Sequence, residues 1–157
     1  MDEKFKKQAL RMFSYGVYIL TSKFEDNYCA ATVTWVSQAS FKPPLISVCI
    51  KRDSASYTVV KERGKFLLHI LSKDQKDLAA SFFKQTTLEN GFINEQKYQS
   101  QDNLPLLTAV PAYLKCRVLE IMEYGDHPLF LAEVKNAVVR RELEPLELRD
   151  TGWSYGG

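Results

Sequence analysis

Two adjacent prolines, Pro43 and Pro44, constrain the fold of this chain more than any other feature. Neither residue has an amide hydrogen, so the pair cannot lie inside a β-sheet. The runs on either side, Ala30–Val36 and Leu45–Ile50, are apolar and rich in β-branched residues, as buried strands are. The sequence therefore predicts two strands separated by a polar loop and a proline turn.

Small polar and basic side chains gather at the ends of these two predicted strands. One interpretation is that they satisfy one another and the nearby backbone. The other is that they converge on a flat polar ligand that carries an anionic group. The residues alone leave both interpretations open. The set comprises Thr32, Thr34, Ser37, Gln38, Ser40, Lys51, Arg52, Ser54 and Ser56.

Length and charge narrow the class of protein. A chain of 157 residues fits one domain over residues 1–157 with a hydrophobic core of its own. A formal net charge of +2 argues against nucleic acid or a membrane surface as the main partner. No apolar run reaches the length of about 18 residues that a membrane span needs. The segment Met1–Lys4 is charged and lacks the apolar core of a secretory signal, so we expect a cytoplasmic protein.

The cysteines predict no metal site. Cys29, Cys49 and Cys116 are far apart in the sequence, and no Cys or His spacing matches a metal-binding motif. Each cysteine lies within an apolar run. We therefore expect three buried, reduced thiols.

The first part of the chain predicts a helix and a hairpin. Phe5, Ala9, Met12 and Phe13 form one apolar stripe at helical spacing, and Gly16 is placed to end that helix. A β-rich run over Val17–Thr21 then precedes the Cys29 strand across a polar turn.

The rest of the chain alternates between predicted strands and short helices. Asp53 or Ser54 is placed to cap a helix that Gly64 ends. Ser72 and Gln75 stand at capping-box spacing before another helix. Residues Thr86–Pro111 read as a long surface excursion with at most one helical turn. The predicted elements are helix Ala55–Arg63, strand Phe66–Leu71, a helix from Ser72 to about Lys84, and strands Tyr113–Met122 and Leu129–Val139, joined at Glu123–Pro128.

This order predicts a mainly β protein with flanking helices. About six strands and two or three helices occur without strict βαβ alternation, and neighbouring strands have hairpin spacing. No G-x-G-x-x-G motif follows a strand, so a dinucleotide fold of the Rossmann type is not predicted. An antiparallel barrel with helices packed outside it is the expected fold.

Five segments, in this order, resemble those of the flavin reductase-like family: Tyr15-Gly16-Val17, Ala31–Ser40, Pro43-Pro44-Leu45, Leu67–Gln75 and Gly125-Asp126-His127. The resemblance extends from about Phe5 to Leu146. It implies an antiparallel split β-barrel of the FMN-binding type that forms a homodimer.

The resemblance also implies where a flavin would bind. Without it, the same residues read as an ordinary Thr-rich strand, a helix cap with solvated basic neighbours, and core phenylalanines. The implied flavin loop is Thr32, Val33, Thr34, Trp35, Gln38, Ala39 and Ser40. The implied phosphate side is Lys51, Arg52, Ser54, Ser56 and Tyr57, and the segment with Ser81 and Phe82 borders the ribityl and phosphate side. We expect Asp53 to face away from a phosphate and to cap the helix.

The two histidines have different expected roles. Gly125-Asp126-His127 alone would be a simple turn, but the resemblance places His127 near the open face of the flavin, as the catalytic residue that meets the nicotinamide. His69 alternates within an apolar strand and is expected to be a hydrogen-bonded core residue.

The implied function is an FMN-binding oxidoreductase in which NADH or NADPH passes hydride to the flavin, with FAD as the other candidate cofactor. Two alternatives stay open: a flavoredoxin-like electron carrier reduced by a redox partner protein, and a dimeric binding module without activity. The chain departs from the family pattern at Trp35, which is bulky, and over Thr151–Gly157, where an aromatic residue after a basic turn is usual. Whether Trp153 or Tyr155 reaches the flavin stays open.

Overall fold

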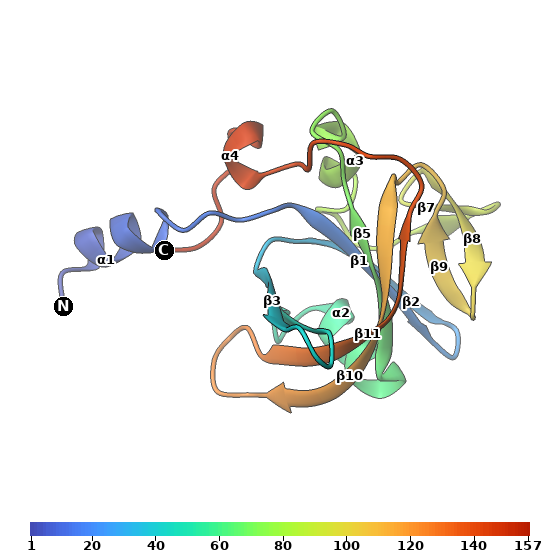
Figure 1. Cartoon of the computed structure of the whole chain (residues 1–157), viewed down its shortest axis with the longest axis horizontal. Coiled ribbons are helices and arrows are strands. Elements are labelled where there is room, and N and C mark those ends of the chain that lie inside the picture. Colours follow the sequence, from blue (N-terminus) through green and yellow to red (C-terminus); the bar gives the residue numbers. More distant parts are fainter.

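Eleven strands and four helices make up the structure, a computed structural model that describes every residue from Met1 to Gly157 (Figure 1). The strands are β1 (Tyr18–Phe24), β2 (Asn27–Val33), β3 (Val36–Ser40), β4 (Leu45–Cys49), β5 (Lys65–Ile70), β6 (Leu88–Glu89), β7 (Phe92–Ile93), β8 (Gln96–Gln101), β9 (Leu104–Leu107), β10 (Ala112–Met122) and β11 (Leu129–Val139). The helices are α1 (Glu3–Leu10), α2 (Ala55–Arg63), α3 (Lys76–Ala80) and α4 (Leu148–Thr151).

The main sheet is antiparallel and has seven strands in the order β2-β1-β5-β10-β11-β4-β3. Its two edge strands, β2 and β3, follow each other in the sequence but do not pair. Cys29 from β2, Val48 from β4 and Phe130 from β11 nevertheless share one buried core cluster. Strands from the two ends of the sheet can share a core only if the sheet curls, so it forms a barrel that is open between β2 and β3. The predicted antiparallel split barrel is confirmed.

The strand predicted over Ala30–Val36 is interrupted, and the interruption opens the barrel. β2 ends at Val33 and β3 begins at Val36, so Thr34 and Trp35 lie between two strands at opposite edges of the sheet. The Trp35 carbonyl accepts a hydrogen bond from the Cys49 amide at 3.0 Å, which fixes this break against the end of β4. Residues 38–40, expected in a loop, belong to β3 instead. The proline turn before β4 is as predicted.

Helix α2 has the predicted bounds and ends at Gly64 as predicted, but the expectation that Asp53 caps it is wrong. The Ser54 side chain accepts a hydrogen bond from the Tyr57 amide at 3.1 Å, so Ser54 rather than Asp53 is the N-cap. Gly64 ends the helix with φ 67°, a left-handed conformation that favours glycine. Val59 and Val60 face the barrel core and attach α2 to it.

Two predicted helix ends are wrong. The first helix, α1, ends at Leu10, and Gly16 forms a β-bridge with Glu147 instead. The helix predicted after Ser72 and up to about Lys84 is only the short α3, which begins after its N-cap Gln75 and ends before its C-cap Ser81. The Gln75 side chain accepts a hydrogen bond from the Ser72 amide at 3.0 Å.

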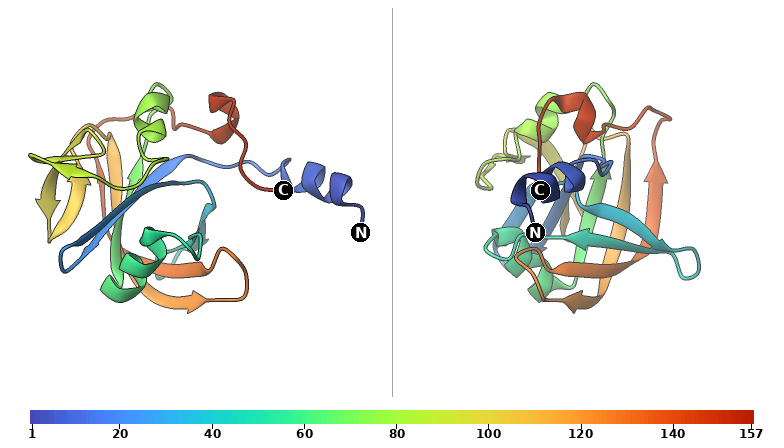
Figure 2. Two further views of the ribbon diagram at one scale, coloured as in Figure 1. Left: turned by 180° about the vertical axis from the view of Figure 1, so that it is seen from behind. Right: turned by 90° about the vertical axis from the view of Figure 1, so that its left-hand side faces the viewer.

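Helix α1 stands outside the barrel. It has no buried residue, and Figure 2 shows it projecting from the body beside the end of the chain. The side chain of Phe5 is exposed, as are those of Met12 and Phe13 just beyond the helix. No helix of the structure is both long enough and apolar enough to cross a membrane.

Residues 86–111 form strands β6 to β9 of a second, four-stranded sheet, so the prediction of a surface excursion is wrong. Ile93 and Leu107 from this sheet are fully buried in a second core cluster. The turns at Asn90-Gly91 and Asp102-Asn103 have positive φ angles, which two-residue hairpins require. The small sheet therefore packs against one end of the barrel and belongs to its core.

Candidate functional site

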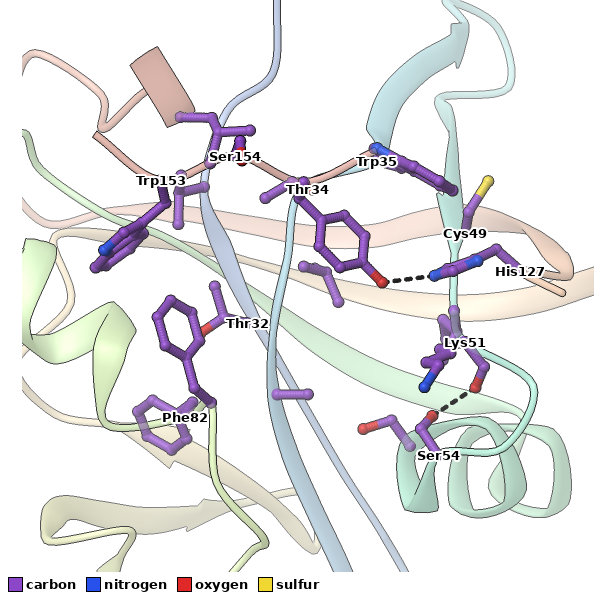
Figure 3. Close-up of a pocket in the computed structure, with 18 residues that line it drawn as sticks. Thr32, Thr34, Trp35, Cys49, Lys51, Ser54, Phe82, His127, Trp153 and Ser154 are labelled. Atoms are coloured by element: carbon purple, nitrogen blue, oxygen red, sulfur yellow. Dashed lines mark hydrogen bonds between the residues drawn. The ribbon is translucent and has the colours of Figure 1, made fainter. Parts of the chain in front are cut away.

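A cavity of about 580 Å³ lies beside the break between β2 and β3 (Figure 3). Pockets for small molecules have this size and this mixture of apolar walls and few polar groups. Nine of the predicted site residues line it: Thr32, Val33, Thr34, Trp35, Lys51, Ser54, Ser56, Phe82 and His127. Nine others complete the lining: Val17, Ala31, Cys49, Ile50, Phe83, Leu148, Trp153, Ser154 and Tyr155.

The polar side chains at the β2–β3 break differ in whether they have hydrogen-bond partners within the protein. The Thr32 hydroxyl donates to the Ala79 carbonyl at 2.6 Å and is therefore satisfied within the protein. The Thr34 hydroxyl and the Trp35 indole nitrogen are buried and have no hydrogen-bond partner. The indole nitrogen lies against the backbone at Gly156. Unpaired buried polar groups are costly and rare, so the Thr34 hydroxyl in the cavity wall favours a ligand that pairs with it.

The polar end of the cavity is formed by Lys51 and the start of α2. The Lys51 ammonium lies 3.2 Å from the Asp53 carboxylate, and both side chains are more than half exposed. Asp53 therefore faces solvent, as expected, although it is not the cap. The Ser54 hydroxyl donates to the Lys51 carbonyl at 2.7 Å, so its hydrogen is already engaged (Figure 3). The first amides of a helix lack partners within the helix, and together with Lys51 they favour an anion here.

Arg52 and Tyr57, predicted on the phosphate side, do not line the cavity. One Arg52 nitrogen donates to the carbonyls of Glu123 and Gly125 at 2.6 and 3.0 Å. The Tyr57 hydroxyl contacts the Glu123 carboxylate, which also pairs with Lys61 at 2.9 Å. Both residues thus hold the β10–β11 loop, which carries His127, against the start of α2.

His127 is hydrogen-bonded through both ring nitrogens. Nδ1 lies 2.8 Å from the Asp126 carboxylate, and Nε2 lies 2.6 Å from the Tyr155 hydroxyl (Figure 3). The imidazole also packs on Trp35, with the two ring centroids 4.6 Å apart. Hydrogen bonding from His127 lowers the pKa of Asp126, and burial raises the pKa of Tyr155. His127 is thus oriented at the cavity wall, and its contact with a nicotinamide stays a prediction.

The opposite end of the cavity is aromatic. Phe83 and Trp153 meet edge to face with centroids 4.7 Å apart, and Phe82 is buried beside them. Ser81, predicted together with Phe82, does not line the cavity, and its hydroxyl donates to the Leu78 carbonyl at 2.7 Å. Figure 3 shows Phe82 and Trp153 on the side of the cavity away from Lys51 and His127.

Three predicted loop residues lie away from this cavity. Gln38, Ala39 and Ser40 are on β3, and the Gln38 amide donates to the Ser40 carbonyl at 3.3 Å. Gln38 and Ser40 line a different cavity, of about 480 Å³, between β3, β4 and neighbouring strands. The structure therefore brings the first half of the predicted flavin loop to the site, and the second half elsewhere.

The sequence did not predict Cys49 as a site residue, and it did not settle whether Trp153 or Tyr155 reaches the site. Cys49 is half-buried and lines the cavity, whereas Cys29 and Cys116 are buried as predicted. Cys49 ends β4 two residues before Lys51, so it has the same positional signal as the predicted site residues. No local pattern indicates that Trp153 and Tyr155 reach the cavity, because their contacts lie far away in the sequence.

The other histidine is a core residue, as predicted. His69 is fully buried; its Nδ1 lies 2.9 Å from the Ile19 carbonyl, and its Nε2 accepts from the Leu107 amide at 3.2 Å. Burial lowers the pKa of His69 to about 4. No group of His, Cys, Asp and Glu side chains in the structure could hold a metal ion.

Comparison with known proteins gives a consistent set of relatives. The 4-hydroxyphenylacetate 3-monooxygenase reductase component of Pseudomonas aeruginosa is 29% identical over 85% of this chain and 79% of its own length. The ferric-chelate reductase (NAD(P)H) of Archaeoglobus fulgidus is 27% identical over 91% of this chain and 86% of its own length. Among solved structures, flavin reductase PheA2 is 27% identical, with a TM-score of 0.77 over 94% of this chain and 93% of that one.

Other relatives are much longer. The chain spans 24% and 48% of the length of two further curated relatives. The model of the flavin reductase like domain matches residues 10–154, which is nearly the whole chain. This chain therefore belongs to the flavin reductase like domain family.

Proposed function

We propose that this chain is an FMN-dependent flavin reductase that takes hydride from NADH or NADPH, and that residues 1–157 form one such domain. The observation that carries the proposal is the unpaired, buried Thr34 hydroxyl in the wall of a largely apolar cavity that also holds Lys51. The names of the relatives support it, since two of them are reductase enzymes or components and one is described as NAD(P)H-dependent.

The residues present fit a flavin mononucleotide. Thr34 offers an unpaired hydroxyl to the polar rim of a flat ring, while Phe82 and Trp153 offer apolar contact. Lys51 and the first amides of α2 suit a single phosphate group. This match to one phosphate supports FMN over FAD.

The chemistry comes from the cofactor, and the protein positions the reactants. When bound, a flavin supplies an acceptor for the hydride at N5. Thr34 and Lys51 would hold the cofactor, and His127 would orient a reactant on the side away from the aromatic end. Hydride transfer needs the two reacting atoms within roughly 3–3.5 Å and needs no protein nucleophile.

The proposal includes a homodimer and a cytoplasmic location. Supporting the dimer, α1 buries none of its residues, and the apolar side chains at residues 5, 12 and 13 are left exposed. Supporting the location, all three cysteines are free, as is usual in a reducing compartment.

The test is stopped-flow bleaching of flavin absorbance in a mixture of the purified protein, FMN and NADH, repeated with NADPH. Rapid bleaching with either nucleotide is expected. Bleaching with neither, while FMN stays bound, contradicts the reductase and points to a carrier reduced by another redox protein. A colourless protein that does not take up FMN contradicts flavin binding itself.

A further inference from the structure

A further cavity, the arginine cavity, has a volume of about 290 Å³ and shares a wall with the proposed flavin cavity. The shared wall is Leu148 together with the segment Trp153–Tyr155. The rest of the lining comes from residues 11–15, just beyond α1, and from Glu147 and Arg149 at α4. Figure 1 shows the last residues running from α4 back to α1, where the chain ends. A ligand longer than the flavin cavity would therefore meet the arginine cavity next.

Arg11 and Arg149 line this cavity, and each is held by only one of its nitrogens. Arg11 Nε donates to the Gly156 carbonyl at 3.1 Å. Arg149 Nε pairs with the Glu147 carboxylate. The terminal nitrogens of both guanidinium groups have no partner in the protein and form two forks of the kind that binds phosphate through paired hydrogen bonds. Glu147 is the one carboxylate in the lining, so two arginines against one carboxylate leave an excess positive charge.

Aromatic rings complete the lining of the arginine cavity. Phe13 and Tyr15 meet edge to face with centroids 6.4 Å apart, and Trp153 belongs to the shared wall. Phe13 is 62% exposed, so a flat ligand has access to its ring. Nucleic-acid bases stack on aromatic side chains, and phosphates bind arginine forks. Together, the rings and the two arginines suit a phosphorylated nucleoside.

We infer that the arginine cavity binds the 2′-phosphoadenosine end of NADPH, and that Arg11 and Arg149 make NADPH the preferred hydride donor. The inference rests on the proposed function, because it assumes that the nicotinamide reacts in the neighbouring cavity. The 2′-phosphate is a monoester with three free oxygens and a charge of about −1.5 to −2, so it can bond both forks at once. Each phosphate of the diphosphate bridge has two free oxygens and a single charge, which suits one fork. NADH has no 2′-phosphate and leaves the pair of arginines without this partner.

FAD also carries an adenosine, but it matches this cavity less well. Its adenosine is joined to the flavin through the phosphate, whose proposed position is at Lys51 and Ser54. Neither residue lines the arginine cavity, and Figure 3 shows both on the side of the flavin cavity away from Trp153 and Ser154. The adenosine of FAD has no 2′-phosphate either. The occupant that fits both the position and the charge is therefore NADPH.

The test measures kcat/KM for NADPH and for NADH in wild type, Arg149→Gln and Arg11→Gln. Wild type should prefer NADPH by about tenfold or more, the effect of charge-assisted hydrogen bonds. Each variant should lower the ratio of the two constants about fivefold to tenfold, mainly through a higher KM for NADPH. Arg149→Lys keeps the charge without the fork and should restore only part of the ratio. Arg141→Gln is the matched control, since Arg141 is exposed and lines neither cavity.

A second measurement needs neither flavin nor turnover. Isothermal titration calorimetry of the apo protein compares adenosine 2′,5′-bisphosphate with adenosine 3′,5′-bisphosphate, which has the same charge and a displaced phosphate. The 2′,5′ isomer should bind about tenfold more tightly, and its affinity should fall about tenfold in Arg149→Gln. Equal affinity for the two isomers would show a general anion site and overturn the inference.

The outcomes separate this inference from the proposed function. If neither nucleotide reduces the flavin, the proposed function fails, and calorimetry still decides whether the cavity binds 2′-phosphoadenosine. If wild type is active without preferring NADPH, or if Arg149→Gln and Arg11→Gln keep its preference, this inference alone fails. Equal losses for NADH and NADPH place the diphosphate at the arginines and overturn it as well. So does a loss of FAD affinity with normal FMN affinity, because the adenosine of FAD would then occupy the cavity.

Discussion

At the scale of single residues, the site is distinguished by which polar groups lack partners. Thr32 and Thr34 are two residues apart on the same edge, yet only the Thr34 hydroxyl is free. The sequence predicted both as ligands of the flavin, because residue type and spacing do not reveal that Ala79 supplies an acceptor to Thr32. That carbonyl is 47 residues away along the chain. The sequence could predict that Thr32 and Thr34 lie in the cavity wall. Which of the two hydroxyls lacks a hydrogen-bond partner could be seen only from the tertiary contacts.

Thr34→Val should therefore separate flavin affinity from stability. Valine replaces an unpaired buried hydroxyl with a methyl group of similar shape, so the free energy of unfolding should stay the same or rise slightly. FMN affinity should fall about fivefold to tenfold, as measured by flavin fluorescence titration. Thr32→Val is the counterpart and should lower stability by about 1 kcal/mol, because it removes the hydrogen bond from the Thr32 hydroxyl to the Ala79 carbonyl. Equal FMN affinity in wild type and Thr34→Val would show that this hydroxyl does not meet the cofactor.

The charges beside Lys51 provide a second residue-scale prediction. Ser54→Asp should keep α2 intact, because aspartate is also a good N-cap, but it places negative charge at the expected phosphate position. Its FMN affinity should fall about fivefold. Asp53→Asn removes the carboxylate that lies 3.2 Å from the Lys51 ammonium, and FMN should bind about twofold tighter.

Riboflavin, which has no phosphate, is the control ligand for both variants. Its affinity should not change in either protein. If FMN and riboflavin change in parallel, the phosphate lies elsewhere in the cavity. Ser54→Asn introduces a neutral N-cap of the same size as aspartate. It therefore separates the effect of the added charge from that of the lost hydroxyl.

At the scale of elements, prediction succeeded where local signals define the ends. Helix α2 has Ser54 before it and Gly64 after it, and both act as predicted. The strands of residues 88–107 were missed although Asn90-Gly91 is a strong two-residue hairpin signal. Strands β6 to β9 are short and partly polar, so their sequence pattern is weak. They are stabilised by packing against the barrel, which the local sequence does not show. The break at Thr34–Trp35 has no local signal at all, because it depends on curling of the whole sheet.

The β10–β11 loop shows how one residue positions another element. Arg52→Gln removes a guanidinium that donates to the carbonyls of Glu123 and Gly125. We expect a folded protein whose FMN affinity is within about twofold of wild type but whose rate of reduction by NADH is about tenfold lower, because His127 is less well placed. NMR of the His127 imidazole should show line broadening from loop motion. Normal turnover in Arg52→Gln would mean that the loop is held without it.

His69 connects the two sheets and makes their attachment sensitive to pH. It lies on β5, and its ring bonds to Ile19 of β1 and Leu107 of β9. Its pKa is about 4 in the folded protein, against an ordinary value of 6.5, because burial disfavours the charged ring. The unfolded chain therefore binds more protons between these values, and stability is complete above about pH 6.5 and falls as the pH drops toward 4.

Chemical denaturation between pH 7.5 and 4.5 measures this effect. The free energy of unfolding should fall by up to about 1.4 kcal/mol per pH unit from this residue alone. His69→Gln should be less stable than wild type at pH 7.5 and should lose that part of the pH dependence. An identical slope in His69→Gln would assign the acid sensitivity to other groups.

At the scale of the whole molecule, the exposed α1 is the feature that a single chain does not explain. The barrel buries its apolar side chains in three clusters, whereas α1 adds none of its residues to them. Phe5 of the predicted apolar stripe lies on α1, whereas Met12 and Phe13 lie just beyond its end, and all three side chains are exposed. A second copy would supply the missing surface, in agreement with the proposed homodimer.

The joint variant Phe5→Ser, Met12→Ser should convert a dimer into a monomer. The two side chains are 66% and 73% exposed, so their replacement should leave the fold and the melting temperature of the monomer unchanged. Sedimentation equilibrium at micromolar concentration should give wild type twice the chain mass of 18.0 kDa and the variant once that mass. Val139→Ser is the control, since Val139 is equally exposed (69%) but lies at the end of β11. If wild type sediments at 18.0 kDa, or if the variant remains a dimer, α1 does not hold two copies together.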